Sequence, residues 1–213
     1  AEKRALQRVQ KQRTEMPVLD GIMLVQGIAP DQLPELLHRR IELQGEWLPR
    51  YSVFLDNRVM DHRTGFYVVT PLQLQDSQRA VLVLRGWAER DFQDRARLPD
   101  VNTPPGRVHV EGLLAARVPA NFALGEDEGG QIRQNLDLDE FRRETGLMLA
   151  EVIVQQTGAP SDGLIRHWPP PPVTVERHYG YALQWFGLCA LLGVLLVWFQ
   201  IVRPLLSHSR TRD

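Results

Sequence analysis

The hydrophobic positions in the first two thirds of the chain follow a period of two in several segments. In residues 41–47 every second position is apolar or glycine, and the positions between them are glutamate or glutamine. This alternation is typical of a half-buried β-strand. Residues 66–70 and 80–84 are apolar on both faces, so we expect these strands at the centre of a sheet. The expected strands are 41–47, 51–58, 66–70, 80–84, 107–114 and 149–156.

Two short helices and a polar turn are expected between these strands. A leucine stripe at i, i+3 and i+4 within residues 30–37 predicts the first helix. Asp137 and Glu140 resemble a capping box and predict the second helix, ending near Thr145. The polar residues 61–65 predict a turn. Because most connections are short, the predicted fold class is mainly β (α+β), an antiparallel sheet curled into a small barrel or sandwich.

The pattern changes at residues 181–202, which read YALQWFGLCALLGVLLVWFQIV and carry no charge. At about 1.5 Å per residue they span roughly 33 Å, slightly more than the ~30 Å hydrocarbon core of a bilayer. This run predicts a C-terminal transmembrane helix. The alternative is a buried helix of a soluble core, but such helices are seldom apolar all round for so long. Arg203, Arg210 and Arg212 follow the run, which predicts a cytoplasmic tail at 203–213 and a domain on the opposite side.

The predicted β-domain, residues 17–168, has a segment of different composition at each end. Residues 1–16 are polar with a loosely helical pattern. They are expected either to continue a first transmembrane helix that this chain lacks or to form a frayed tail. Residues 169–180 form a linker that begins with four prolines, a stiff and extended sequence. We therefore expect the domain to be held close to the bilayer.

Composition and charge exclude several classes of function. The formal net charge of -1 argues against a nucleic-acid binder, which needs a basic face for phosphates. The single cysteine, Cys189, excludes an internal disulfide and a cysteine-based zinc site. No GxGxxG, P-loop, GxSxG or HExxH motif occurs, and no nucleophile–base pair is apparent, so we expect no enzyme. Four histidines are scattered and are expected to be surface or capping residues; they are His38, His62, His109 and His167.

His178 differs from these histidines because it lies three residues before the apolar run. If the helix extends back to it, His178, Ala182 and Trp185 share one face at spacings of four and three. A neutral imidazole beside the small Ala182 can ligate the iron of a lipophilic haem. The alternative is an interfacial histidine that bonds to headgroups, water or the domain. On the residues alone, that alternative is favoured.

Three blocks of the sequence resemble the Surf1 family, the assembly factors of haem-copper cytochrome c oxidase. They are RRIELQGEWLPRYSVFLDNRVMDHRTGFYVVTPL from residue 39, VLVLRGW from residue 81, and RHWPPPPVTVERHYGYALQWF from residue 166. The chain departs from the family in three places. Leu84 and Arg177 stand where the family commonly has asparagine, and Ala88-Glu89 stands where a Val-Pro commonly follows.

The Arg85-Gly86-Trp87 part of the second block has a structural interpretation. Glycine lets a strand end turn sharply, and we expect Trp87 to cover the rim of the core.

The resemblance implies two transmembrane helices flanking a domain in the periplasm or the intermembrane space. It implies a role in supplying or stabilising haem a while subunit I of the oxidase matures, with haem a synthase as a second expected partner. The haem-binding role of the family's membrane-edge histidine carries over to His178, with Tyr181, Ala182 and Trp185 beside the cofactor. With the resemblance, the ligand interpretation of His178 is favoured. The alternative is a cofactor-free membrane scaffold that holds oxidase intermediates.

The basic residues are mostly arginine, with lysine only at Lys3 and Lys11. This composition hints at a GC-rich bacterial gene. The expected location is therefore the bacterial inner membrane, with the domain in the periplasm, rather than the mitochondrial inner membrane.

Overall fold

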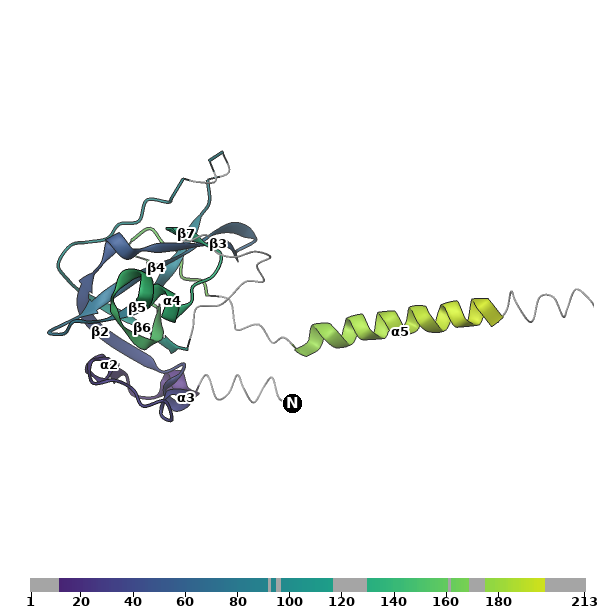
Figure 1. Ribbon diagram of the computed structural model, residues 1–213, viewed down its shortest axis with the longest axis horizontal. Coiled ribbons are helices and arrows are strands. Elements are labelled where there is room, and N and C mark those ends of the chain that lie inside the picture. The colour runs from purple at the N-terminus through teal and green to yellow at the C-terminus, as the bar shows by residue number, and fades with distance from the viewer. Residues whose placement is uncertain are drawn as a thin grey trace, which may run out of the picture. The chain divides into compact units, whose positions relative to one another are not determined.

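The computed structural model describes the chain in six stretches and divides it into two compact units, residues 1–169 and 170–213 (Figure 1). Within the last stretch, side chains are described for 184–193, 195 and 196. Of the predicted segments, residues 1–11 of the polar segment 1–16, residues 169–174 of the linker 169–180, residues 198–202 of the span 181–202 and the whole tail 203–213 lie outside the described residues. The described residues are 12–91, 93–94, 97–116, 130–160, 162–168 and 175–197.

Five strands of the first unit close into a barrel. Neighbouring strands are hydrogen-bonded in the order β2, β6, β8, β5 and β4, and β4 pairs back with β2. The prediction of a mainly-β, barrel-like domain is confirmed. These strands are β2 (Arg40–Trp47), β4 (Arg63–Leu74), β5 (Arg79–Glu89), β6 (Arg107–Ala115) and β8 (Met148–Gln156).

Among the five barrel strands, the expectation of an antiparallel sheet is wrong at one pair. β8 lies between β5 and β6, antiparallel to β6 but parallel to β5. The chain reaches β8 only after a long excursion that includes helix α4 (Leu138–Thr145). Since β5 and β8 are far apart in sequence, their direction relative to each other is not fixed by a tight turn. The local pattern of each strand carries no information about that pairing.

The remaining elements extend or cover the barrel. β3 (Val53–Met60) pairs with β4, β7 (Ile132–Arg133) with β3, and β1 (Leu19–Asp20) with β2. The last two pairings are parallel. The short helical elements are α2 (Ile22–Gln26), α3 (Leu33–Leu36) and the 3-10 turn η1 (Pro49–Tyr51).

Local signals in the sequence were accurate at helix α4 and less so at the β3–β4 connection. The Asp137 carboxylate accepts hydrogen bonds from the backbone N–H groups of Asp139 and Glu140, as a helix cap does. Between β3 and β4 the turn has only two residues, Asp61 and His62, both with positive φ. Because such a turn matches the strand twist, β4 starts at residue 63 instead of after residue 65.

The strands β4 and β5 are buried on both faces, as predicted. Nearly every residue of each is buried. One face packs with Leu43 and Val110 inside the barrel, and the other packs with Phe141 of α4. Because apolar side chains cover both faces of these strands, their sequence shows no alternation of apolar and polar residues.

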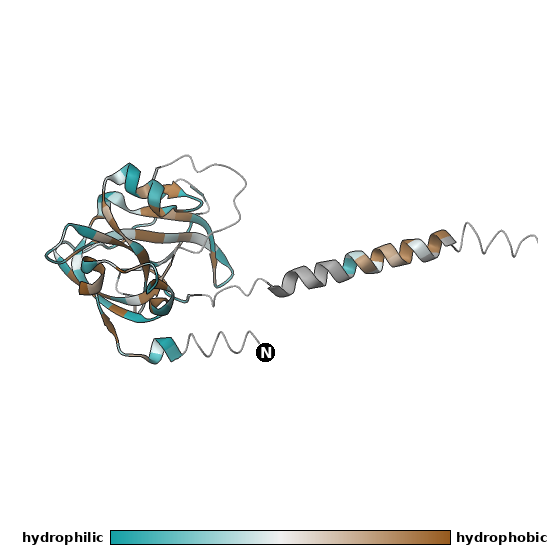
Figure 2. Cartoon of the chain, turned by 60° about the horizontal axis from the view of Figure 1, so that its bottom comes forward, coloured by the Kyte–Doolittle hydropathy of each residue, from teal (hydrophilic) through white to brown (hydrophobic). Residues whose placement is uncertain are grey.

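The second unit contains helix α5 (Val175–Val197), 23 residues long. From Gln184 onward its described residues are mostly apolar, and Figure 2 shows this part mainly in the hydrophobic colour. No helix in the described part of the chain combines the length and apolar character required to cross a membrane. The predicted span 181–202 extends five residues beyond the described helix, and it stays a prediction.

Candidate functional site

The predicted haem-site residues all lie on helix α5. The helix begins at Val175, so His178 has helical backbone, and its position shares one side of the helix with Ala182 and Trp185. The side chains of His178, Tyr181 and Ala182 lie outside the described residues. The indole of Trp185 is 66% exposed, so its ring face is available to a flat ligand. Among the three residues on this side of the helix, histidine is the type that ligates haem iron, whereas alanine and tryptophan supply no ligand atom to it.

In the β-domain, residues of the first two blocks meet around Trp87. This side chain is fully buried, so the expectation that it covers the rim of the core is wrong. Its indole Nε1 donates a 2.8 Å hydrogen bond to the backbone carbonyl of Arg58. The ring reaches Arg58 across β4 at Gly65, where an added Cβ would lie 2.6 Å from the indole. Glycine at 65 therefore makes room for the indole.

The third block begins beside the same strand. The backbones of Trp87 and Ile165 exchange two hydrogen bonds of 2.8 Å each, so the segment 162–168 lies along β5. A Cβ on Gly86 would lie 2.6 Å from the Cβ of Leu164. The expectation that Gly86 turns a strand end is wrong, because β5 continues to Glu89. The glycine instead allows the close approach of a second backbone.

Buried ion pairs hold the same segment, which we call the exit segment (residues 162–168). The Asp162 carboxylate pairs with Arg85 at 3.0 Å and with Arg166 at 2.8 Å, and all three side chains are nearly inaccessible to solvent. Arg85 also donates to the hydroxyl of Thr103, and its guanidinium lies over the ring of Trp47. Burial lowers the pKa of Arg85, and the nearby Asp162 carboxylate opposes this change. Removing the carboxylate would leave two buried cations without their counter-charge.

The exit segment ends at Trp168, the last described residue of the β-domain. Its indole Nε1 donates to the backbone carbonyl of Gln156 at 2.8 Å, and its ring packs edge-to-face on Tyr67 at 5.4 Å. Burial raises the pKa of Tyr67, and the Arg58 guanidinium opposes this change. The chain therefore leaves the domain from a fixed point. This arrangement anchors the exit segment to the barrel.

The SURF1 family model matches residues 1–190. This chain belongs to the SURF1 family. The match includes the barrel, the exit segment and the His178 position on α5, so the resemblance seen in the sequence is confirmed.

Several SURF1-like proteins are similar to the chain over most of its length. A SURF1-like protein of Rickettsia prowazekii is 25% identical over 203 residues, which cover 90% of this chain and 80% of the relative. One of Drosophila melanogaster is 29% identical over 203 residues, covering 82% and 63%. The cytochrome oxidase assembly protein SHY1 of Saccharomyces cerevisiae is 23% identical over 133 residues, covering 60% and 34%.

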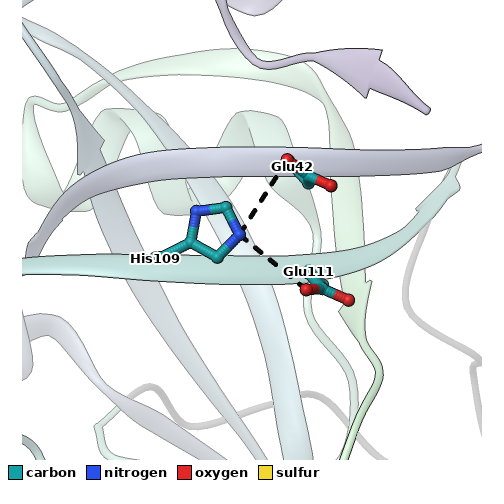
Figure 3. Close-up of side chains that lie close together, drawn as sticks. All are labelled: Glu42, His109 and Glu111. Atoms are coloured by element: carbon teal, nitrogen blue, oxygen red, sulfur yellow. Dashed lines mark ion pairs between the residues drawn. The ribbon is translucent and has the colours of Figure 1, made fainter.

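Two features of this SURF1 family chain were missed by the sequence analysis. The exit segment and Trp87 are brought together by pairing between residues far apart in the chain, which no local pattern reports. The second feature is His109, which was expected to be an isolated surface residue. It is exposed, but it lies beside Glu111 of its own strand, β6, and Glu42 of the neighbouring strand, β2 (Figure 3). The only signal in the sequence was the alternation that placed all three residues on outer faces.

Proposed function

We propose that this SURF1 family chain is a non-enzymatic assembly factor for cytochrome c oxidase. Two observations support the proposal: the family match over residues 1–190 and the similarity to SHY1, a protein named for oxidase assembly. In this proposal the β-domain acts through contacts with other proteins, and a hydrogen bond from Trp168 to the Gln156 carbonyl fixes the point where the chain leaves it. In this role the domain contacts subunit I and haem a synthase.

Helix α5 serves as the membrane anchor in this proposal. Its described side chains include large apolar groups that face solvent, with Phe186 72% and Leu196 63% exposed. A contiguous apolar surface of this kind needs lipid or a partner to cover it. Residues 181–202 then lie in the bacterial inner membrane, and the β-domain lies in the periplasm. The positive charges after the run, such as Arg203, support this orientation.

The proposed cargo is haem a, with His178 as an axial ligand. The observation that carries this proposal is the continuity of α5 through His178, which gives the histidine and Trp185 positions on one side of a helix. Haem iron accepts a neutral imidazole nitrogen, and the porphyrin supplies the flat apolar surface. In this proposal Tyr181 and Ala182, which follow His178 on the same helix, line the haem site as the family resemblance implies. A carrier of this kind binds haem with moderate affinity so that the haem can be transferred.

The decisive experiment is the absorption spectrum of the detergent-solubilised protein, purified from cells that synthesise haem a. We expect a Soret band in the wild-type protein and its loss in His178→Ala, together with impaired oxidase assembly. His167→Ala is the matched control, because His167 is an exposed histidine of the β-domain. If His178→Ala leaves both the Soret band and oxidase assembly unchanged, the carrier mechanism with this ligand is wrong.

The alternative, a cofactor-free scaffold, is favoured by the exposed apolar surface of α5, which suits a partner helix as well as lipid. It predicts stoichiometric co-purification with subunit I in cells that make no haem a. The carrier proposal predicts that this co-purification is lost in such cells.

A further inference from the structure

Three side chains on the outer face of the barrel bring metal-ligating atoms together. Glu42 on β2 lies directly opposite Glu111 on β6 in the antiparallel ladder, and His109 lies two residues before Glu111 on the same face. The imidazole Nε2 is 4.0 Å from a carboxylate oxygen of Glu42 and 3.9 Å from one of Glu111 (Figure 3). One ligand atom from each residue lies within 4.8 Å of the other two.

Within the part of the chain that the structure describes, no arginine or lysine neutralises the negative charge of Glu42 and Glu111. Like charges placed directly opposite each other on a sheet are destabilising. Among the ion pairs of the described residues, Glu42 and Glu111 have only His109 as a partner, and neither pairs with an arginine or lysine. The imidazole lies near both carboxylates, but the two distances are too long for it to form a hydrogen bond with either.

We propose that Glu42, His109 and Glu111 form a binding site for a divalent transition-metal ion of the Zn²⁺ class. Zinc accepts imidazole nitrogen and carboxylate oxygen at about 2.0–2.2 Å, which in tetrahedral geometry separates neighbouring ligand atoms by roughly 3.4 Å. The two imidazole–carboxylate separations exceed this value by about half an ångström, and the ligand atoms of Glu42 and Glu111 lie within 4.8 Å of each other. Rotation of the exposed side chains on their fixed backbone ladder brings the three ligand atoms to the required spacing. Three protein ligands leave the fourth position open for water or for a ligand from a partner.

The donor types restrict the choice of metal. The set has one imidazole and two carboxylates and contains no sulfur. Soft Cu⁺ prefers thiolate or thioether ligands, and Mg²⁺ prefers oxygen ligands alone, so neither ion matches the set. Zn²⁺ accepts this mixture of ligands, as does Co²⁺, which is therefore a suitable spectroscopic probe.

A neighbouring cavity supports the proposal. Glu42 and His109 also line a cavity of about 570 Å³, whose wall includes the acidic residues Asp20 and Asp76. The cavity gives room for a water ligand beside the ion, and its acidic wall favours a cation over an anion. All of these residues belong to the β-domain, so the proposed metal site does not depend on α5 or on haem.

The test is titration of the purified full chain, without an affinity tag, with Zn²⁺ by calorimetry and with Co²⁺ by visible absorption. We expect saturable binding of one ion per chain. His109→Gln and Glu111→Gln should each weaken it by at least about tenfold, as loss of supporting residues at metal sites commonly does.

Two matched variants separate this site from other ligands on the chain. His62→Gln removes another exposed histidine, and Glu46→Gln removes an exposed glutamate of the same strand, so both should bind Zn²⁺ like the wild type. Circular dichroism should show the same fold in every variant, because all the substituted side chains are exposed. The proposal is overturned if no saturable binding occurs. It is equally overturned if His109→Gln and Glu111→Gln bind Zn²⁺ as tightly as the wild type, since the ion then binds elsewhere.

Discussion

The indole Nε1 of Trp87 donates a hydrogen bond to the carbonyl of Arg58, a residue two strands away in the sheet. The strand between them, β4, offers no obstacle because it has Gly65 at the crossing point. The register of β3 against β4 is irregular between Leu55 and Arg58, which interrupts the regular ladder there. The indole thus provides the Arg58 carbonyl with a donor from outside its own strand pair. Arg58 and Gly65 of the first sequence block and Trp87 of the second depend on one another at this point.

We predict that Gly65→Ala strongly destabilises the β-domain. The added Cβ would lie 2.1 Å from the carbonyl oxygen of Ala88 and 2.6 Å from the Trp87 ring, so backbone and indole must move. Overpacking of this kind typically costs about 1–3 kcal/mol, and more where backbone is involved. The measurement is urea unfolding followed by near-UV circular dichroism. Gly187→Ala is the control, because nothing lies within 4 Å of its added Cβ; equal losses in both variants would contradict the prediction.

Trp87→Phe tests the hydrogen bond together with the part of the indole that phenylalanine does not replace. Phenylalanine keeps most of the apolar ring but has no donor, so the Arg58 carbonyl loses the indole partner it has in the wild type. The expected loss is about 1–3 kcal/mol of unfolding free energy. Trp185→Phe on α5 replaces an exposed indole and should change the stability by less than about 0.5 kcal/mol. A Trp87→Phe protein as stable as the wild type would show that the bond contributes nothing.

Asp162→Asn should release the exit segment. The substitution keeps the shape of the side chain but leaves Arg85 and Arg166 as buried cations without a carboxylate, a change that typically costs about 3–5 kcal/mol. Glu89→Gln is the matched control, because its pair with Arg63 is exposed and should contribute less than about 1 kcal/mol.

Hydrogen exchange locates the effect of Asp162→Asn. The backbone amides of Trp87 and Ile165 bond to each other's carbonyls, so they should exchange faster in this variant than in Glu89→Gln. Unchanged protection of both amides would show that the ion pairs do not hold the segment.

His38 should make the domain less stable in mild acid. Burial, and secondly the charge of Arg13, lower the pKa of His38 in the folded chain. Below the usual histidine pKa of about 6.5 the unfolded chain therefore binds the proton more readily, and stability falls as the pH drops through this range. His38→Asn should reduce that fall, and asparagine tolerates the positive φ at this position.

The check for His38 is urea unfolding at several pH values between 5 and 7.5. His62→Asn is the matched control, since His62 also has a positive φ but is exposed. It should keep the pH profile of the wild type. If His38→Asn keeps it as well, the pH dependence of stability has another origin.

Elements whose signal is local could be predicted from the sequence. The alternation in 41–47 gave strand β2 within one residue, and Asp137 marked the start of α4. Long-range pairing could not be predicted. The parallel β5–β8 pair and the contact of the exit segment with β5 join residues far apart in the sequence, and no period in the sequence encodes them.

In the candidate site, too, local features could be predicted from the sequence and long-range contacts could not. The sequence analysis placed His178 on a helix only if the helix extends back beyond residue 181, which α5 does. Its role as a haem ligand rests on the family resemblance and stays a prediction. Gly86 was misinterpreted because a glycine in a strand suits either a sharp turn or a close neighbour. Only the position of Leu164 distinguishes the two. His109 was dismissed because its partner Glu42 comes from a strand far away in the sequence.

The position of β8 has a consequence for how the protein is made. Strands β5 and β6 each pair along one edge with β8. Because β8 is the last strand of the barrel to be synthesised, these two edges stay unpaired until it is made. A chain that stops before residue 148 would therefore present two open, apolar edges at once. Such edges recruit strands from other molecules. Chains truncated anywhere before β8 should therefore be degraded or aggregate, and no partly functional domain should remain.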